Sequence, residues 1–523
     1  MATAAAQQVQ PREQWTGQLG FLLSAIGSAI GLGNIWRFPA VAYENGGGAF
    51  LIPYLVALLT AGIPILLLDY SLGHRMRGSA PAVFRRLGKK FEPLGWFQVA
   101  IAFVIATYYT VIIVWAVRYV GFSITLAWGD DPGGFFTGDF LQDAGPTLTT
   151  DIVGGIFWPM LILWIITLVI LALGVARGIE RANKIFLPLL VVLFIILVVR
   201  ALFLPGAMDG LNEFFTPNWE ALGDPGVWIA AYSQIFFSLS IAFGIMLTYS
   251  SYLRRRSNLV PVSYVAAFAN SSFEMLAGIG VFATLGFMAF QQGIGVGELE
   301  GISGVVLSFI TFPQIISMMP GGAIFGVLFF GSLTLAGFTS LLSILQVVSA
   351  AFQEKFGLTR VQVSVLIGGL CAVISLALFS TTSSLAMLDT VDKYTNEVGV
   401  VTSAILMCLI VGLGLRKLPE LQAHLNSVST AHVGTWWRVL VGAVVPIALI
   451  YMLITSVMGL FEEPYSGYPW NFVNTVGWGV VGAMILAALV YTVVPWRRPV
   501  DDFTPDPIPG FVTRSRREKA GPR

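Results

Sequence analysis

The stretch GSAIGLGN, residues 27–34, interrupts an apolar segment that otherwise runs from about 16 to 42, long enough to cross a membrane. Each of its three glycines costs about 1 kcal/mol relative to alanine in a helix interior. Asn34 and Arg37 add polar groups at a depth where they need a partner or a water-filled cavity. The stretch therefore predicts a membrane helix that is unwound near its middle. The spacing of Gly27 and Gly31 alone would also fit a close contact between two helices.

A second interruption lies in FSLSIAFG, residues 237–244, inside an apolar segment from about 226 to 252. Two hydroxyl side chains and a glycine replace apolar residues there at a similar depth. Paired interruptions five spans apart are typical of an inverted repeat with a binding site at the membrane midplane. Unwound backbone offers carbonyl oxygens to a cation, and the helix N-termini beside it favour an anion.

The composition excludes a soluble protein of ordinary type. Apolar residues make up 56% of the 523 residues and charged residues only 11%, against roughly 25% in soluble domains. Runs such as 156–176 are continuously apolar rather than alternating, which argues against a membrane β-barrel. We predict twelve helical spans, at about 16–42, 48–76, 95–127, 154–175, 183–203, 226–252, 262–292, 323–352, 362–380, 385–415, 434–459 and 474–495.

Lysine and arginine cluster after the even-numbered spans, in 75–90, 177–184, 254–256, 355–360, 416–417 and the segment after 496. The opposite loops, 128–151, 204–225, 293–322 and 460–473, carry Asp and Glu but neither Lys nor Arg. Because basic loops stay on the cytoplasmic side, we expect a multi-pass plasma-membrane protein with both termini in the cytoplasm. The first residues show no signal-peptide pattern. The net charge of +1 gives no indication of nucleic-acid binding.

The interruptions divide the chain into two five-helix repeats, 15–203 and 226–415, joined by an extracellular loop at 204–225. Within the second repeat, 293–322 is apolar enough to fold back as short helices and form a lid. Residues 416–495 hold two accessory helices. A cytoplasmic tail is expected at 1–14 and a disordered one, rich in proline and charge, at 496–523. Cys371 and Cys408 lie in apolar runs, which indicates neither a disulfide framework nor a thiolate metal site.

Three segments carry a specific resemblance: GSAIGLGNIWRFPAVAYENGGGAFLIPY at 27–54, GVWIAAYSQIFFSLSIAFG at 226–244 and AGFTSLLSILQ at 336–346. They are similar to signature segments of the neurotransmitter:sodium symporter family, and the likeness extends from about residue 12 to 392. The resemblance implies an all-α membrane protein with about 12 transmembrane helices, built as a LeuT-type 5+5 inverted repeat with interrupted helices 1 and 6. Helices 11 and 12 are accessory, and they resemble the family only in being membrane spans of the same kind, without a shared signature segment.

The resemblance also implies two sodium ions as coupling ions and no other cofactor. The first sodium site maps onto Ala29, Asn34, Ser238 and Asn270, completed by the carboxylate of the substrate. The second maps onto the carbonyls of Gly27, Ile30 and Ala336 and the hydroxyls of Thr339 and Ser340. A cluster of carbonyl, amide and hydroxyl oxygens suits a hard cation that has lost its water. Taken alone, Thr339 and Ser340 also fit hydroxyls that bond back to their own helix.

The substrate residues implied by the resemblance surround the two interruptions. They are Ala29, Gly31, Leu32, Gly33, Ile105, Tyr109, Phe237, Ser238, Ser240, Phe243, Ser340 and Ile344. Members of the family that carry monoamines have an Asp at the position of Gly31, which pairs with the amine. Glycine leaves room for a substrate carboxylate instead, so we expect an amino acid. None of the residues expected around the side chain of the substrate is charged. A substrate with a neutral, apolar side chain is therefore favoured, and the particular amino acid is left open.

Gate residues follow from the same resemblance. Arg37 and Asp392 resemble an outer charge pair that closes over Phe237 and Tyr109. Arg12, Trp15, Ser251 and Tyr252 resemble an inner latch, with Glu354 at a position where the family usually has Asp. In span 5, Gly178 and Pro188 fit either a helix that unwinds to admit water or a simple proline kink.

Glu274 lies four residues after Asn270, on the same face of its helix. A carboxylate at that depth in the membrane needs an interaction partner or a functional role. Chloride-dependent members of the family have a Ser there, with the anion among residues matching Tyr54, Gln234, Ser238 and Asn270. We therefore expect Glu274 to supply the negative charge itself, making transport independent of chloride. The alternative is a protonated carboxyl that only hydrogen-bonds to Tyr54 or Gln234.

Other function classes fit the sequence less well. An enzyme is not expected, because His74, His424 and His432 all fall in predicted loops, away from any nucleophile or metal cluster at membrane depth. A nucleotide-binding loop of the GxxxxGK[ST] type does not occur either. A proton-coupled permease of the same fold and an amino-acid sensor that keeps the binding site stay open. The expected partners are a small amino acid, sodium and membrane lipid, and the oligomeric state is left open.

Overall fold

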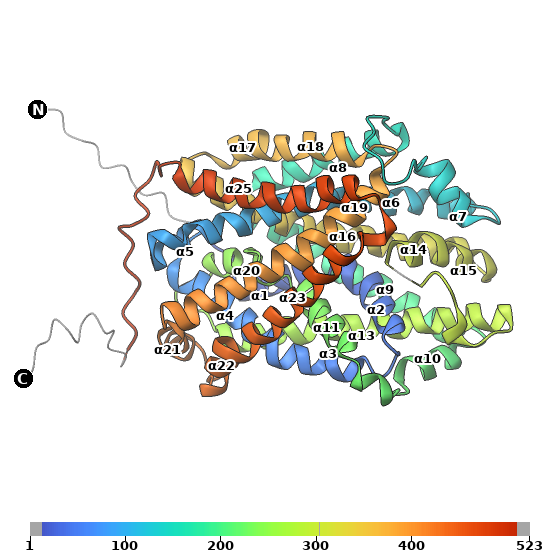
Figure 1. Cartoon of the computed structure of the whole chain (residues 1–523), viewed down its shortest axis with the longest axis horizontal. Helices are drawn as coiled ribbons and strands as arrows, with labels where there is room; N and C mark the ends of the chain where they lie inside the picture. The colour runs from blue at the N-terminus through green and yellow to red at the C-terminus, as the bar shows by residue number, and fades with distance from the viewer. Residues whose placement is uncertain (1–12, 303, 510–523) are drawn as a thin grey trace, which may run out of the picture.

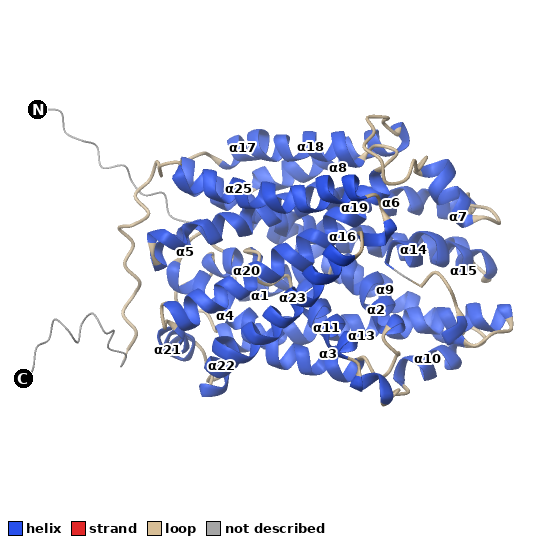
Figure 2. Cartoon of the chain, in the orientation of Figure 1, coloured by secondary structure: helices blue, strands red, loops and turns tan. Residues whose placement is uncertain are grey.

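The computed structural model describes residues 13–302 and 304–509, and within these residues helices joined by loops make up the fold, without strands (Figure 2). The helices of the first half are α1 Gln18–Ala29, α2 Phe38–Glu44, α3 Leu51–Ala57, α4 Ile63–Met76, α5 Ala80–Leu87, α6 Glu92–Thr125, α7 Pro132–Gly134, α8 Gly154–Leu173, α9 Glu180–Leu202 and α10 Ala207–Phe215. Those of the second repeat are α11 Pro225–Ser238, α12 Ile245–Ser251, α13 Leu259–Gln292, α14 Gly304–Val306, α15 Phe312–Met318, α16 Gly322–Phe356, α17 Arg360–Val363, α18 Gly369–Phe379, α19 Ser384–Tyr394 and α20 Val401–Cys408. The accessory part contains α21 Leu418–Val428, α22 Thr435–Val439, α23 Val445–Glu462, α24 Trp470–Val473 and α25 Gly479–Val493.

Ten helical runs in the described part of the chain are long and apolar enough to cross a membrane. They are Leu51–Met76, Lys89–Thr125, Gly154–Leu173, Val175–Leu202, Leu259–Gln292, Gly322–Phe356, Arg360–Phe379, Ser384–Gly414, Thr435–Gly467 and Trp470–Val493. The pair Gln18–Ala29 and Gly33–Glu44, bent by 52° at a short break, makes an eleventh. The sixth predicted span corresponds to α11 and α12, which are separated by Leu239–Gly244 and are individually shorter than a membrane span. The structure therefore breaks the chain at the two places that the sequence indicates.

Two long helices form the centre of the molecule. α6 and α16 pack along each other and are buried over most of their length. By contrast, α8, α9, α18 and α25 expose large apolar side chains, among them Ile162, Val192, Val373 and Leu486. Apolar side chains on the outside and polar ones inside fit a protein whose solvent is the hydrocarbon of a bilayer.

The long helices run between two ends of different charge (Figure 1). At one end lie α7, α10, α14 and α15, within the loops that carry Asp and Glu but no basic residue; we call this the acidic end. At the other lie α5, α21, α22 and the segment 496–509, near most of the Lys- and Arg-rich turns; we call this the basic end. In the loop 293–322, Phe309 packs on the rings of Trp36 and Trp115, so this loop covers the acidic end of the first span.

The segment 496–509 differs from the disordered tail that the sequence predicts. Asp501 accepts two hydrogen bonds from Arg85 on α5, at 2.8 and 2.9 Å, and Asp506 pairs with Arg255 at 3.2 Å. Val500 and Ile508 are buried. Proline and charge are typical of disordered chain, but here the acidic residues meet arginines that other helix ends present. Residues 510–523 lie outside the described part of the chain.

Candidate functional site

The two helix breaks face each other and are held by side chains from neighbouring spans. Ser240 and Ala242 have φ values of +52° and +67°, which L-residues adopt only when their surroundings enforce it. The N–H of Ala242 donates to Asp69 at 3.0 Å, and its carbonyl accepts from Gln98 at 3.1 Å and Ser403 at 2.6 Å. Spans 2, 3 and 10 thus satisfy the backbone groups that the broken helix exposes. These three partners carry no motif and escaped the sequence analysis.

Two glycines of the first break are required by close packing. A Cβ atom on Gly33 would lie 2.2 Å from the ring of Phe237. One on Gly31 would lie 2.8 Å from the hydroxyl of Ser340 and 2.9 Å from that of Tyr109. The missing side chains therefore allow spans 1, 3, 6 and 8 to meet at one point.

The residues predicted for the first sodium site form one buried cluster. The amide of Asn34 donates to Asn270 at 2.9 Å and to Ser238 at 3.4 Å, and its oxygen accepts from the N–H of Gly31 at 2.8 Å. The amide nitrogen of Asn270 donates to Ser238 in turn. Ala29 lies in the same break and is buried. Amide and hydroxyl groups from spans 1, 6 and 7 thus meet at one place, and such groups can supply the oxygen ligands that fit a hard cation.

The residues predicted for the second site lie where span 1 crosses α16. Thr339 donates back to Leu335 at 3.1 Å and Ala336 at 3.0 Å, as a hydroxyl bonded to its own helix does. Ser340 instead donates across to the carbonyl of Ser28 at 3.2 Å. On the opposite side, Gly27 approaches Asn183 of span 5 so closely that a Cβ would lie 2.2 Å from the amide oxygen. Gly27 and Ile30 are both buried here. The self-bonded alternative therefore describes Thr339 but not Ser340.

A cavity of about 40 Å³ lies between these two clusters. It is lined by Ala29, Gly31, Gly33, Ile105, Tyr109, Phe237, Ser238, Ser240, Phe243, Ser340 and Ile344, which are eleven of the predicted substrate residues. Leu32, the twelfth, contributes its N–H, which donates to the hydroxyl of Tyr109 at 3.2 Å. Ser28, Asn34 and Asn396 also line the cavity, and none of its lining residues is charged. Asn396 was missed, although it lies one turn after Asp392 on the same helix face.

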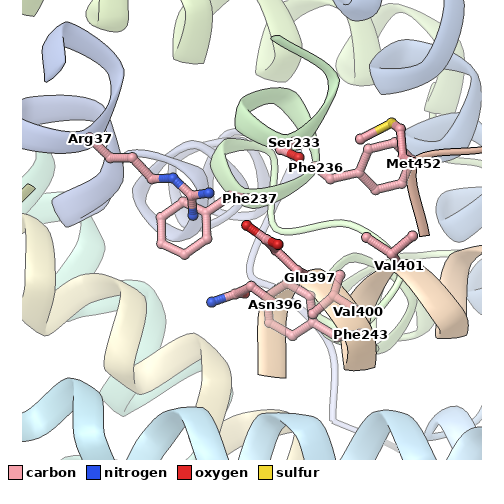
Figure 3. Close-up of a pocket in the computed structure, with 10 residues that line it drawn as sticks. All are labelled: Arg37, Ser233, Phe236, Phe237, Phe243, Asn396, Glu397, Val400, Val401 and Met452. Atoms are coloured by element: carbon pink, nitrogen blue, oxygen red, sulfur yellow. The ribbon is translucent and has the colours of Figure 1, made fainter. Parts of the chain in front are cut away.

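A second cavity, of about 20 Å³, lies nearby (Figure 3). Phe237, Phe243 and Asn396 line both cavities and so separate them. The other lining residues are Arg37, Ser233, Phe236, Glu397, Val400, Val401 and Met452. We call it the outer cavity, because it includes the predicted outer gate residue Arg37.

The predicted outer gate differs from a direct ion pair. The guanidinium of Arg37 lies over the ring of Phe237, 4.5 Å from its centroid. Asp392 instead accepts hydrogen bonds from Tyr108 at 2.7 Å and Asn396 at 2.8 Å, and no contact within 4.0 Å joins it to Arg37 in the part of the chain that the structure describes. The two charges face the same region, but aromatic and amide side chains lie between them.

The predicted inner latch lies at the basic end. Trp15 is buried, and its indole N–H donates to the carbonyl of Tyr249 at 2.9 Å. Its backbone N–H donates to the carbonyl of Tyr252 at 3.3 Å. Ser251 donates to Thr248 on its own helix at 2.5 Å, and Tyr252 accepts from Gln346 at 2.8 Å. Arg12 lies outside the described residues.

Glu354 of the predicted latch contacts the residue that precedes α5. Its carboxylate accepts from the backbone N–H of Ser79 at 2.8 Å and from the Ser79 hydroxyl at 2.7 Å. Ser79 precedes α5, so Glu354 connects α16 to the loop between spans 2 and 3. In span 5, Gly178 precedes α9 and Pro188 lies inside it.

Glu274 is fully buried beside the first cluster. It accepts a hydrogen bond from Gln234 at 2.7 Å and another from the hydroxyl of Tyr54. Tyr54 also contacts Ser271 at 2.8 Å. The carboxyl group is thus surrounded by neutral donors rather than by a counter-charge. This is the environment in which a buried carboxyl exchanges a proton or balances a nearby cation.

In the described ranges, no group of three or more His, Cys, Asp or Glu residues could hold a metal. His74 lies in the last turn of α4 rather than in the loop that the sequence suggests, and its ring nitrogen contacts that of His424 at 2.9 Å. Burial, together with His74 and two neighbouring arginines, lowers the pKa of His424 to about 3. This pair is therefore a neutral structural contact between α4 and α21.

Comparisons with known proteins agree with this arrangement. Residues 12–144 and 130–498 match the model of the sodium:neurotransmitter symporter family. An uncharacterised sodium-dependent transporter of Methanocaldococcus jannaschii is 38% identical over 489 residues, 92% of this chain and 97% of that protein. The human sodium- and chloride-dependent creatine transporter 1 is 33% identical over 371 residues, 64% of this chain and 58% of the relative.

A solved structure supports the same conclusion. The crystal structure of MhsT in complex with L-phenylalanine matches with a TM-score of 0.73 and 35% identity, covering 85% of this chain and all of that one. This likeness confirms the predicted all-α fold with interrupted helices. The chain is therefore a sodium-dependent membrane transporter, and it belongs to the sodium:neurotransmitter symporter family.

Proposed function

We propose that the protein imports a neutral, apolar L-amino acid together with two sodium ions, by alternating access. The observation that carries the proposal is the uncharged cavity between the two oxygen-rich clusters. The proposed position of the substrate carboxylate is beside Gly31, which lines this cavity together with Tyr109 and Ser340. That carboxylate completes the first sodium cluster, so the substrate and the ion bind each other. The phenylalanine bound by MhsT supports the same substrate class.

The proposed orientation places the basic end in the cytoplasm of a plasma-membrane protein. Lys and Arg in short loops favour the cytoplasmic side, and the turns that carry them gather at the basic end (Figure 1). The acidic end is then extracellular, and the outer cavity lies on the path by which substrate enters.

Uptake of labelled amino acids into proteoliposomes, with and without an inward sodium gradient, tests the coupling. We expect concentrative uptake of apolar amino acids only with the sodium gradient. Uptake driven equally well by a proton gradient without sodium would favour the proton-coupled permease. Specific binding without counterflow of internal for external amino acid would favour a sensor.

Chloride independence is the second part of the proposal, and it rests on Glu274. A buried carboxylate among Tyr54, Gln234 and Ser271 supplies the negative charge that an anion would otherwise bring. We predict unchanged uptake when chloride is replaced by gluconate at constant sodium, and a requirement for chloride in Glu274→Ser. The variant Glu274→Gln is the control, because it keeps the shape of the side chain without its charge and still fills the space of an anion. Loss of wild-type uptake in gluconate would overturn this part alone.

A further inference from the structure

Asn396 lies in the wall between the substrate cavity and the outer cavity. It belongs to the helical turn Thr395–Val400, which follows α19, and it is half-buried. Figure 3 shows it between Phe237 and Phe243, and these three residues line both cavities. It is thus a polar side chain set among rings, at the side of the substrate cavity that Ile105, Phe243 and Ile344 make apolar.

The orientation of the Asn396 amide is fixed by its partners. Its nitrogen donates to the carboxylate of Asp392 at 2.8 Å, to the backbone carbonyl of Asp392 at 3.0 Å and toward the hydroxyl of Tyr108 at 3.4 Å. A carboxylate and a carbonyl only accept hydrogen bonds, so the opposite assignment of nitrogen and oxygen is excluded. The amide nitrogen of Asn396 is therefore used in hydrogen bonds to the predicted outer gate residue Asp392 and to Tyr108.

The acceptor end of the same amide is left for a ligand. Among the residues that the structure describes, none donates to the Asn396 oxygen, and this oxygen is not among the fully buried unpaired atoms. Neither Tyr108 nor Asp392 lines the substrate cavity, whereas Asn396 does. Since the nitrogen bonds to those two residues, the oxygen is the atom of this amide that stays available to a ligand in the cavities that Asn396 lines.

We propose that Asn396 is a specificity-determining residue, and that its oxygen accepts a hydrogen bond from a substrate whose aromatic side chain ends in a ring N–H. This inference rests on the proposed amino-acid transport and narrows its substrate class. The rings of Phe237 and Phe243 provide apolar surface for a flat side chain. An indole suits the wall because it is apolar and carries one donor without an acceptor. Tryptophan is the amino acid with this chemistry.

The inference predicts a preference that shape alone does not produce. A neutral hydrogen bond exchanged against water favours the donor-bearing ligand by roughly 3- to 10-fold. The sharpest probe is 3-benzothienyl-alanine, in which sulfur replaces the indole N–H and the two-ring outline is kept. Purified wild-type protein should bind tryptophan about 5-fold more tightly than this analogue in sodium-containing buffer, measured by competition against a labelled apolar amino acid.

The variant Asn396→Leu separates specificity from structure. Leucine keeps the approximate volume but removes the acceptor, so the ratio of the two affinities should fall to about 1. Loss of the bonds to Asp392 and Tyr108 weakens both ligands equally and leaves the ratio unchanged, which distinguishes the two roles. Asn474→Leu, the same substitution at an exposed site of the accessory part, is the matched control and should keep the wild-type ratio.

The outcomes separate this inference from the proposed function. Equal affinity for tryptophan and its sulfur analogue in the wild type, or an unchanged ratio in Asn396→Leu, would overturn the role of Asn396 while amino-acid transport stands. A complete lack of sodium-dependent amino-acid uptake would instead overturn the proposed function itself.

Discussion

The acidic and basic ends of the molecule close over the central cavity in different ways. At the acidic end, Arg37 rests on the ring of Phe237, and Asp392 is held by Tyr108 and Asn396 without a direct ion pair to Arg37 in the described structure. A small cavity remains beside these residues. The contacts of these two gate residues are made through their side chains.

At the basic end, closure involves backbone contacts and buried ion pairs. Glu92 accepts from Lys355 and Arg85, each at 2.7 Å, and from the indole of Trp496 at 2.8 Å. Trp15 adds backbone contacts to the turn after α12, and Arg360 pairs with Glu13 at 2.5 Å. Opening the basic end therefore disrupts these backbone contacts and ion pairs.

The largest effect is expected at the centre, where the two ends meet. Replacing Thr339 and Ser340 together by Ala removes both predicted hydroxyl ligands of the second sodium site, so sodium-driven uptake should fall to background. The double variant also removes the hydrogen bond from Ser340 to Ser28 of the broken span.

A matched control exists on the same helix. Ser332 and Thr334 bond only to their own helix, at 2.8 Å each, and their double replacement by Ala should leave uptake near the wild-type rate. Concentrative uptake by the Thr339/Ser340 variant, shown to be inserted and folded, would remove the second site from the coupling mechanism.

A second prediction concerns the contact between substrate and ion. Gly31→Asp places a carboxylate beside Tyr109 and Ser340, where the carboxylate of the substrate is expected. Amino-acid binding should fall more than ~10-fold below that of Gly31→Asn, which has the same size without the charge. Scintillation proximity binding measures both. Equal losses in the two variants would attribute the effect to crowding and leave the position of the substrate carboxylate elsewhere.

The third prediction tests whether the hydrogen bonds to Asp392 contribute to closure of the acidic end. Asp392→Asn weakens the bonds from Tyr108 and Asn396 to a charged group, which are worth about 1.5–3 kcal/mol each when buried. Transport should drop roughly 10-fold, while sodium binding changes less than two-fold. Asp389→Asn is the control, because the hydrogen bonds of this nearby carboxylate in the described structure come from Tyr465 and Tyr468, in the loop 460–473. A wild-type transport rate in Asp392→Asn would reduce Asp392 to a structural contact.

The sequence predicted the parts of this comparison that depend on local chemistry. Glycine, Asn34 and Ser240 do not suit the interior of a membrane helix, so both breaks were predicted within a few residues, and the loop charges separated the two ends. The contacts of Asp69, Gln98 and Asn396 were not predictable in this way, because each is an ordinary residue of its own span. Their roles arise from which unwound carbonyl, N–H or cavity the packing brings next to them.

The contacts of the segment 496–509 were likewise not predictable from the sequence. Proline and charge indicate disorder when the chain is considered alone. The arginines that bind this segment come from α4, α5 and the turn after α12, which are distant in sequence: Arg75 donates to the carbonyl of Asp506, and Arg86 donates to Val500 at 3.2 Å. The hydrogen bond from Arg85 lowers the pKa of Asp501, so this contact stays ionised at neutral pH.

The smallest expected effect tests whether this docked segment contributes to closure of the basic end. A cysteine introduced by Leu253→Cys, at a buried position after α12, reports opening through its reaction with a water-soluble maleimide; the native Cys371 and Cys408 are fully buried. Asp501→Asn should increase the labelling rate about two-fold, since a partly exposed ion pair contributes little. Asp502→Asn, one residue later and exposed, should not. Because a lowered pKa means that the contact persists until the pH falls below the usual aspartate range near 4, the ratio of the two labelling rates should be constant from pH 8 to pH 5. A ratio that falls to 1 by pH 6, or equal labelling of the two variants throughout, would show that the ion pairs within the bundle close the basic end without this segment.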